Sequence, residues 1–361
     1  MKRTIAIILT ILLLIGSLTA CSNKDKYEKY DYTFYGAFDT VIQIIGYTED
    51  QEEFNAYMAE IEARFNELHK LYDRFNDYEG INNIKTINDK AGIEPVKVEK
   101  EIIDLILFSK DLFDKTGNLT NIAMGAVTDI WSDYRDEGIN NPMEAKLPPM
   151  ERLEEAGRHT DMDKIIVNEE EGTVYIEDPD LVLDVGAVAK GYATELVARE
   201  IEEKGLKSAL ISAGGNIRGI GKPLDGIRER WGVGIQNPDA SLFDVGRVLE
   251  TVFINDESVV SSGDYQRYYI VDGEVYHHLI HPETLMPANY YRQVSVVTPD
   301  SGLADFYSTA LYLLPFEESK ALAESMEDFE AMWVFPDGTI EATEGMKEIM
   351  LSHGATGGKK K

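Results

Sequence analysis

Cysteine is nearly absent from this sequence, whose 361 residues include a single cysteine, Cys21. The residues before Cys21 have the order of a lipoprotein signal peptide: Lys2 and Arg3, an apolar run over 5–15, and a small-residue site at 18–20. This order predicts cleavage after residue 20 and acylation of Cys21. The alternative is an ordinary transmembrane helix, which the short apolar run disfavours.

The shortage of cysteine limits the chemistry of the mature chain. Once Cys21 carries the lipid, no thiol is left for disulfides, for thiolate catalysis or for cysteine-ligated zinc. The chemistry of the protein must therefore rest on oxygen and nitrogen groups.

Basic residues are also scarce. The chain has 35 lysines and arginines against 65 aspartates and glutamates, a formal net charge of -30 at pH 7. Nucleic acid and anionic lipid are disfavoured as partners, because both require basic patches. An anionic ligand such as a dinucleotide would need a metal ion or a local set of backbone amides.

Long apolar runs are missing after the signal peptide, so the predicted lipid is the one membrane anchor. We expect a signal peptide at 1–20, a polar tether at 21–31, one large folded domain at 32–345, and a tail at 346–361. The expected location is the extracytoplasmic face of the cell membrane, where the lipid anchors the folded body.

The order of predicted elements is mixed and lacks a steady strand-helix alternation, which favours an α+β fold over a doubly wound sheet. Apolar spacing predicts helices over 51–72, 101–116, 187–204 and 303–314. Strand-like runs occupy 32–46, 164–176, 208–212, 231–236, 247–254, 267–271 and 294–297. Between 133 and 163 the chain is expected to be irregular, because Asn-Asn-Pro and Pro-Pro interrupt it.

Both the Gly-x-Gly-x-x-Gly spacing and the Walker loop are missing, which disfavours conventional nucleotide folds. Two other glycine-bearing segments are present. In 183–193 an apolar strand is expected to deliver Asp184 and Gly186 to the start of a helix, where free amides and Lys190 could meet a ligand. Gly186 permits unusual dihedrals, although the segment could be only a tight connection. In 212–221, four glycines imply close backbone packing or a phosphate cradle.

Histidine is rare, and three of the six histidines are His277, His278 and His281. A zinc site is disfavoured, because adjacent residues of a strand point to opposite faces. We expect one of these histidines to face a cleft as a general base, and the others to be surface or packing residues.

Asp305 and Thr309 are four residues apart in a predicted helix and therefore share one face. A carboxylate and a hydroxyl in this arrangement are hard oxygen ligands that suit magnesium. The alternative is a helix with one exposed acid and a threonine bonded to its own backbone.

Taken together and in this order, the segments resemble the ApbE family of flavin transferases over residues 32–345. The matching segments are Leu183–Tyr192 (Leu-Asp-x-Gly-x-x-Ala-Lys-Gly-Tyr), Ala213–Asn216 (Ala-Gly-Gly-Asn), Ser262–Arg267 (Ser-Gly-Asp-Tyr-x-Arg), the tyrosine-histidine segment before Pro282, and Ala304–Ala310 (Ala-Asp-x-x-Ser-Thr-Ala). The resemblance implies one large α+β domain related to the T-fold, with mixed, mainly antiparallel sheets and flanking helices.

The resemblance also implies the site residues. His278 would accept the proton of a threonine hydroxyl, and Asp305 would act with it in catalysis. Magnesium would lie among the Ala187 carbonyl, Asp305 and Thr309. The residues implied to bind FAD are Phe38, Tyr78, Leu119, Thr120, Asn121, Asp184, Lys190 and Leu279.

The chain departs from the commoner family pattern in several places. Phe38-Asp39-Thr40 stands where Met-Gly-Thr is usual, and Leu119-Thr120-Asn121 replaces a Gly-x-Phe-Asp segment. His281 stands where Asp is usual, and Leu285 where Gly is usual. These departures leave the implied metal ligands unchanged.

The function that the resemblance implies is magnesium-dependent transfer of FMN from FAD to a threonine of an acceptor protein, with release of AMP. The acceptors would be exported subunits of membrane redox complexes. Two alternatives stay open: a metal-dependent FAD pyrophosphatase that produces FMN and AMP, and a flavin-binding lipoprotein without catalysis. A pure binder would not need the Asp305 carboxylate as a metal ligand.

Overall fold

The computed structural model describes residues 26–240 and 246–358. The predicted signal peptide, Cys21 and the first part of the predicted tether lie outside these ranges. Within the described part of the chain, no helix is both long enough and apolar enough to cross a membrane.

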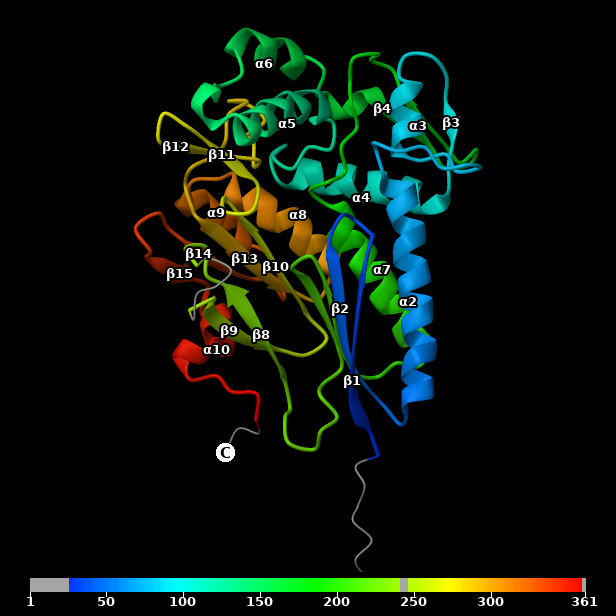
Figure 1. Cartoon of the computed structure of the whole chain (residues 1–361), viewed down its shortest axis with the longest axis vertical. Helices are drawn as coiled ribbons and strands as arrows, with labels where there is room; N and C mark the ends of the chain where they lie inside the picture. Colours follow the sequence, from blue (N-terminus) through cyan, green and yellow to red (C-terminus); the bar gives the residue numbers. More distant parts are fainter. Residues whose placement is uncertain (1–25, 241–245, 359–361) are drawn as a thin grey trace, which may run out of the picture.

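An eight-stranded sheet forms the centre of the fold (Figure 1), in the order β1-β2-β6-β7-β10-β13-β14-β15. Every neighbouring pair in this sheet is antiparallel. Its strands are β1 (Glu28–Tyr35), β2 (Val41–Thr48), β6 (Ala209–Ala213), β7 (Asn216–Ile220), β10 (Ser258–Gly263), β13 (Gln293–Thr298), β14 (Glu330–Val334) and β15 (Ile340–Ala342).

Helices cover one face of the sheet and form the largest core cluster with it. The helices that pack on the sheet are α2 (Gln51–Tyr72), α7 (Ala189–Glu203), α8 (Ser301–Tyr312) and α9 (Phe316–Glu324). The same cluster includes α3 (Ile84–Asp89) and α4 (Lys100–Lys115), which pack mainly against a smaller sheet and α2. The longest of them, α2, begins where the Asp50 carboxylate caps the Glu53 amide at 2.9 Å. Its buried residues Phe54, Met58 and Ile61 recur at helical spacing.

The opposite face of the sheet is covered by a hairpin and a short helix, which form a second core cluster. These elements are β8 (Trp231–Gln236), β9 (Val248–Ile254) and α10 (Glu344–Ile349). Strand β13 is buried along its whole length, with Val296 facing the helices and Val297 facing the hairpin. Burial on both faces explains why Val294, Val296 and Val297 are all apolar in this strand, with Ser295 as the polar residue among them.

A third core cluster lies beyond the edge of the helical layer, at the top of Figure 1. It joins α5 (Gly125–Asn140) and α6 (Met150–Gly157) to the hairpin of β11 (Tyr268–Val271) and β12 (Glu274–His277). A small sheet of β3 (Val96–Lys97), β5 (Thr173–Ile176) and β4 (Ile165–Asn168) completes the strands.

The predicted α+β class with mainly antiparallel sheets is confirmed, and so are the helices at 51–72, 101–116, 187–204 and 303–314 within a few residues. Three local predictions were wrong. The segment 32–46 is two strands joined by a turn, and 164–176 is also a hairpin. The segment 133–163 is not irregular, because α5 continues to Asn140 and α6 follows Pro149.

The boundaries of the folded body also differ from those expected. Strand β1 begins at Glu28, inside the predicted tether, because residues 28–35 pair with β2 along their full length. The chain stays packed past residue 345, where a tail was expected. Met346 is fully buried, and the Gly357 carbonyl accepts hydrogen bonds from the amides of Glu229 and Arg230.

Candidate active site

A cavity of about 140 Å³ opens where the β1–β2 turn, the end of α2 and the start of α7 meet. Its walls combine aromatic rings, three cationic side chains and three carboxylates. The lining residues are Phe38, Asp39, His69, Tyr72, Asp73, Arg74, Phe75, Asp184, Val185, Gly186, Ala189, Lys190 and Arg267. Phe38, Asp184 and Lys190 were predicted as site residues from the sequence.

The β1–β2 turn places Phe38 at the cavity in a left-handed backbone conformation. The φ angles of Phe38 and Asp39 are 54° and 49°, a region that glycine tolerates best. The family pattern has glycine at residue 39, so the departure there introduces strain. The Phe38 amide donates to Nδ1 of His69 at 3.2 Å, and the two rings pack edge to face at 5.7 Å between centroids.

Tyr78 does not line the cavity itself, but its hydroxyl contacts two residues that do, Asp73 and His69. Its hydroxyl donates to Asp73 at 2.7 Å and lies 3.4 Å from Nε2 of His69. Burial, and then the Asp73 carboxylate, raise the pKa of Tyr78 to about 12. Burial opposes the charged form of Asp73, but hydrogen bonds from Asn76 and Phe75 outweigh it and lower the pKa of Asp73. Tyr78 is therefore a neutral ring held in place beside the cavity.

Asp184 is fixed by three donors. Its Oδ2 lies 2.8 Å from Nη1 of Arg74 and accepts from the Thr128 hydroxyl at 3.0 Å. Its Oδ1 accepts from the Gly186 amide at 2.9 Å. Gly186 does not take a positive φ. A side chain there would meet Asp184 Oδ1 at 3.0 Å, so glycine is needed for close approach.

The crossing of α7 and α8 brings together the predicted metal ligands. Asp305 is buried, and its Oδ2 accepts from the Gly191 amide at 2.8 Å. A Cβ on Gly191 would lie 2.3 Å from Cβ of Asp305, so only glycine allows this crossing. The Thr309 hydroxyl, one turn after Asp305, lies 3.3 Å from the Ser262 hydroxyl.

These groups fit a magnesium ion by their chemistry. The Gly191 amide would bond to the Ala187 carbonyl in a regular helix, but it donates to Asp305 instead. In the described part of the chain, no donor bonds to the Ala187 carbonyl. Burial raises the pKa of Asp305, and Lys190 and the Gly191 amide offset this only partly. A carbonyl without a donor, a buried carboxylate and a hydroxyl form a set of hard oxygen ligands.

The two adjacent histidines have different roles. His277 is buried and fully bonded: Nε2 donates to the Ala288 carbonyl at 2.8 Å, and Nδ1 accepts from the Leu279 amide at 3.2 Å. His278 has a buried Nδ1 without a hydrogen-bond partner among the described residues. Burial, and then the charge of Arg267, lower the pKa of His278 to about 3, so its ring is neutral at pH 7. His277 is thus the packing histidine, and His278, which does not line the cavity, stays a prediction as the general base.

Besides Tyr78, four predicted FAD contacts lie outside the lining of the cavity. Leu119 and Leu279 are buried in the main core. The Thr120 hydroxyl donates to the Phe306 carbonyl at 3.1 Å. The Asn121 amide donates to the Thr160 carbonyl at 2.8 Å, and its oxygen accepts from the Ala123 amide at 2.7 Å. In this structure these four residues hold the walls of the site together.

Several lining residues escaped the sequence analysis. His69 lies within the predicted helix 51–72 but was given no role, and Asp73 and Arg74 follow the helix without a recognisable motif. Arg267 was quoted within a matching segment but given no role. The second glycine segment proves to be the β6–β7 turn, where Gly214 has a φ of 58° and a Cβ would lie 2.3 Å from the Thr40 hydroxyl. It packs against the β1–β2 turn that carries Phe38.

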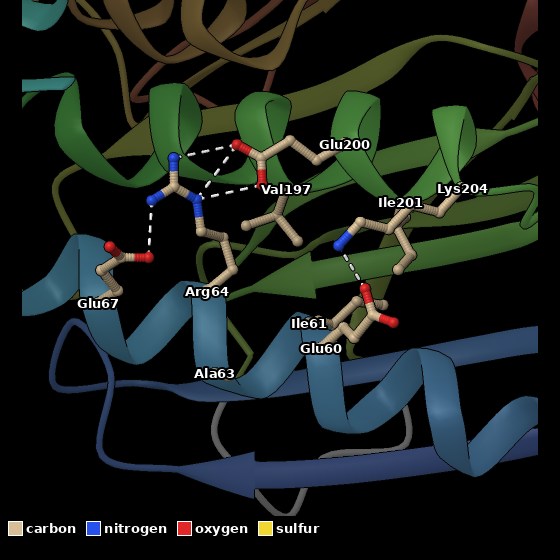
Figure 2. Close-up of a pocket in the computed structure, with 9 residues that line it drawn as sticks. All are labelled: Glu60, Ile61, Ala63, Arg64, Glu67, Val197, Glu200, Ile201 and Lys204. Carbon is tan, nitrogen blue, oxygen red and sulfur yellow. Dashed lines mark hydrogen bonds and ion pairs between the residues drawn. The ribbon is translucent and has the colours of Figure 1, made fainter. Parts of the chain in front are cut away.

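A second hollow of about 250 Å³ lies between α2 and α7, away from these groups (Figure 2). Its cations are already paired. Arg64 contacts Glu67 and Glu101 at 2.7 Å and Glu200 at 3.0 Å, and Lys204 contacts Glu60. No nucleophile, histidine or aromatic residue lines it.

Among the described residues, one group of three acidic or histidine side chains could hold a metal: His159, Asp178 and Asp180. His159 Nδ1 lies 2.8 Å from Asp178, and Asp180 is exposed. None of the three lines the cavity, and no other feature at the group points to an ion.

The fold and the cavity define an α+β protein built to hold a ligand with both an aromatic part and negative charge. Comparison with known proteins agrees. The chain matches the ApbE family over residues 38–333. It is 30% identical over 275 residues to a Treponema pallidum protein named FAD:protein FMN transferase, a match that covers 73% of each chain. A Klebsiella pneumoniae protein of the same name is 29% identical, over 76% of this chain and 82% of its own.

Solved structures show the same fold. The ApbE protein of Thermotoga maritima superposes with a TM-score of 0.75 at 24% identity, over 89% of this chain and 99% of its own. The flavinyl transferase ApbE of Pseudomonas stutzeri superposes with a TM-score of 0.74 at 21% identity, over 91% and 98%. This chain belongs to the ApbE family, and it is an enzyme of the flavin transferase class.

Proposed function

We propose that this enzyme transfers FMN from FAD to a threonine hydroxyl of an exported acceptor protein, with magnesium and with release of AMP. The observation that carries the proposal is the junction of α7 and α8. There the Asp305 carboxylate, the donor-free Ala187 carbonyl and the Thr309 hydroxyl adjoin Lys190, which also lines the aromatic cavity. The aromatic ring system of FAD suits the aromatic side chains of the cavity, and its negatively charged diphosphate suits the cations Lys190 and Arg267.

The reaction balances with the groups present. The threonine oxygen forms a bond to the phosphorus of the FMN half, the bond from that phosphorus to the bridging oxygen breaks, and AMP leaves with the bridging oxygen. The threonine proton passes to Nδ1 of His278, which is neutral and has no partner among the described residues. Phe38 and Tyr78 would hold the flavin ring.

Magnesium would be held by Ala187, Asp305 and Thr309. When bound, it would neutralise the diphosphate and stabilise the charge that develops on the departing AMP. Asp305 is suited to this because burial disfavours its charged form unless a cation is near.

We also propose that the enzyme works at the extracytoplasmic face of the cell membrane, anchored by lipid on Cys21. Its acceptors would be threonine-bearing subunits of membrane redox complexes, such as sodium-pumping or electron-bifurcating ones. The lipoprotein pattern at 1–21 supports this location, because enzyme and acceptor would then share one side of the membrane.

The test is an incubation of the protein with FAD, magnesium and a purified acceptor domain that carries the threonine. We expect the acceptor to become fluorescent in a denaturing gel and to gain the mass of an FMN group. Chelation of magnesium and Asp305→Ala should each abolish the gain. The matched control, Glu200→Ala, removes a carboxylate from the α2–α7 hollow and should leave transfer unchanged.

Two outcomes would replace the proposal. Release of free FMN and AMP with an unlabelled acceptor would identify a metal-dependent FAD pyrophosphatase, in which water takes the place of threonine. Binding of unchanged FAD in the presence of a competent acceptor would identify a flavin-binding lipoprotein.

A further inference from the structure

The segment Ser262–Arg267 joins the end of β10 to the start of β11, and most of its side chains are used within the protein. The Ser262 hydroxyl lies 2.8 Å from that of Ser308 and 3.3 Å from that of Thr309, next to the proposed metal ligands. Gly263 leaves room for the ring of Tyr265, which would lie 2.4 Å from a Cβ at that position.

Asp264 anchors the same turn. Its Oδ2 accepts from Nε of Arg292 at 2.7 Å, and its amide donates to the Arg292 carbonyl at 3.1 Å. Arg292 is held in addition by Asp239 at 2.6 Å. These contacts fix the course of the backbone up to Arg267.

Arg267 is the side chain of this segment that reaches the cavity. It forms no ion pair or hydrogen bond with any other residue that the structure describes. The same holds for the ammonium group of Lys190, which comes from the first turn of α7. The third cation of the cavity, Arg74, is paired with Asp184 and Asp129.

The carboxylates of the cavity do not neutralise these two cations. Asp184 is paired with Arg74, and Asp73 accepts from Tyr78, Asn76 and the Phe75 amide. Asp39, on the β1–β2 turn, is the remaining acid in the lining. Lys190 also acts electrostatically on the buried Asp305 carboxyl without forming a salt bridge with it. In a chain with a net charge of -30, two cations without a salt bridge in one cavity are available to an anionic ligand.

We propose that Arg267 binds the diphosphate of the dinucleotide substrate, with Lys190 as the second cation. The proposal rests on the proposed function for the identity of the ligand. A guanidinium group suits this role because its planar set of donors matches two phosphate oxygens at once. The effect of Arg267 on the pKa of His278 places its charge near the proposed base, and therefore near the phosphorus that is attacked.

The experiment measures dissociation constants of the whole protein for FAD, ADP and riboflavin, with magnesium and with chelator. Riboflavin carries the ring system without phosphate, and ADP carries the diphosphate without the ring. We expect Arg267→Gln to raise the dissociation constants for FAD and for ADP about tenfold or more, both with magnesium and with chelator. Hydrogen bonds to charged groups contribute roughly 1.5–3 kcal/mol. Riboflavin affinity should stay the same, and Arg267→Lys should restore part of the loss.

The matched control is Arg247→Gln, which removes the same charge from an exposed position beside β9, in the hairpin that covers the opposite face of the sheet. It should leave all three constants unchanged. Equal losses for riboflavin and FAD would overturn the proposal, because Arg267 would then support the cavity wall. Unchanged FAD affinity in folded Arg267→Gln would overturn the proposal as well. If the glutamine variant does not fold, the same constants are measured on Arg267→Lys.

The two proposals fail in different ways. Phosphate binding that depends on Arg267, without labelling of any acceptor, would leave this inference intact and count against the transferase. Normal labelling by Arg267→Gln with an unchanged KM for FAD would leave the transferase intact and overturn the inference.

Discussion

The α2–α7 hollow and the cavity are both lined by residues of α2 and α7, but they differ in how their polar groups are satisfied. In the hollow, Arg64 is paired with Glu67 and Glu200, and Lys204 is paired with Glu60 (Figure 2). Glu101, outside the lining, is a third partner of Arg64. In the cavity, Lys190 and Arg267 form no salt bridge with any described residue, although Lys190 acts electrostatically on the buried Asp305, and the nearby His278 has a free Nδ1. The hollow is the larger of the two.

The difference indicates that size alone does not identify a site in this protein. Paired charges hold two helices together and leave nothing for a ligand to satisfy. Unpaired charges and buried atoms without partners cost free energy in the empty protein, and they are retained where a ligand completes them. The four predictions below test this contrast.

The largest effect is expected from His278→Gln. Loss of a general base lowers turnover by about 10²–10⁴-fold, while FAD affinity should change little because the ring does not line the cavity. The measurement is the rate of acceptor labelling at saturating FAD. His277→Gln is the comparison, and it should lower the melting temperature because His277 is bonded on both nitrogens. Labelling by His278→Gln at more than half the normal rate would remove the histidine from the mechanism.

Gly191→Ala should damage the cavity end of α7 and leave the hollow in place. The added Cβ would lie 2.3 Å from both the Asp305 Cβ and the Ser301 carbonyl, and overpacking of this kind costs about 1–3 kcal/mol. We expect a lower free energy of unfolding in urea and loss of magnesium-dependent transfer. The control is Gly246→Ala, where a Cβ would meet nothing within 4 Å. Wild-type transfer by Gly191→Ala would show that the α7–α8 crossing is not needed.

His277 should make stability depend on pH. Burial lowers its pKa from 6.5 to about 4, so the unfolded chain takes up a proton first as the pH falls. The stabilisation present above pH 6.5 is therefore lost as the pH falls toward the folded-state pKa, by about 2 kcal/mol between pH 7 and pH 5. Urea unfolding at both pH values should show a smaller difference for His277→Gln than for wild type. Equal differences would mean that His277 is not buried in its neutral form.

The smallest effect is expected in the hollow. Arg64→Gln removes a partly buried cation with an exposed fraction of 18% and leaves three carboxylates close together, which should cost about 1 kcal/mol of stability. Transfer and FAD affinity should not change. A drop in transfer without a drop in stability would indicate that the hollow takes part in function.

Much of the fold could be predicted from the sequence, because the periodic spacing of apolar residues in the sequence matches the helices of the structure. The helix 51–72 was placed correctly, since its apolar spacing and the Asp50 cap are both local signals. The hairpins at 32–46 and 164–176 were missed because a turn within a strand-like segment divides it into two paired strands without changing the pattern of apolar residues along the sequence. Helix α6 was missed because Pro148 and Pro149 precede it and suggested a loop.

The candidate site was predicted in part: residues within short recognisable segments could be named from the sequence, and residues placed only by tertiary contacts could not. Asp184, Lys190 and Asp305 belong to short segments whose residue order resembles the family, and Phe38 was placed by its position before Thr40 although the residues around it differ from the family pattern. The four residues 119, 120, 121 and 279 were given contacts with FAD, yet the structure uses them to hold its own walls. Their contacts involve residues such as Phe306 and Thr160 that are distant in sequence, so no local pattern could show them.

The sequence by itself determined the α+β class, the family and the types of group available for chemistry, because these depend on composition, periodicity and residue order within short segments. Only the tertiary structure decided which charges have partners. Arg64 and Arg267 are equivalent cations in the sequence. Arg64 lies between two helices and is paired with glutamates, whereas Arg267 lines the cavity without a salt bridge to any described residue. Pairing is a property of distance in space, and residues such as Arg64 and Glu200 become neighbours only when the helices that carry them pack together.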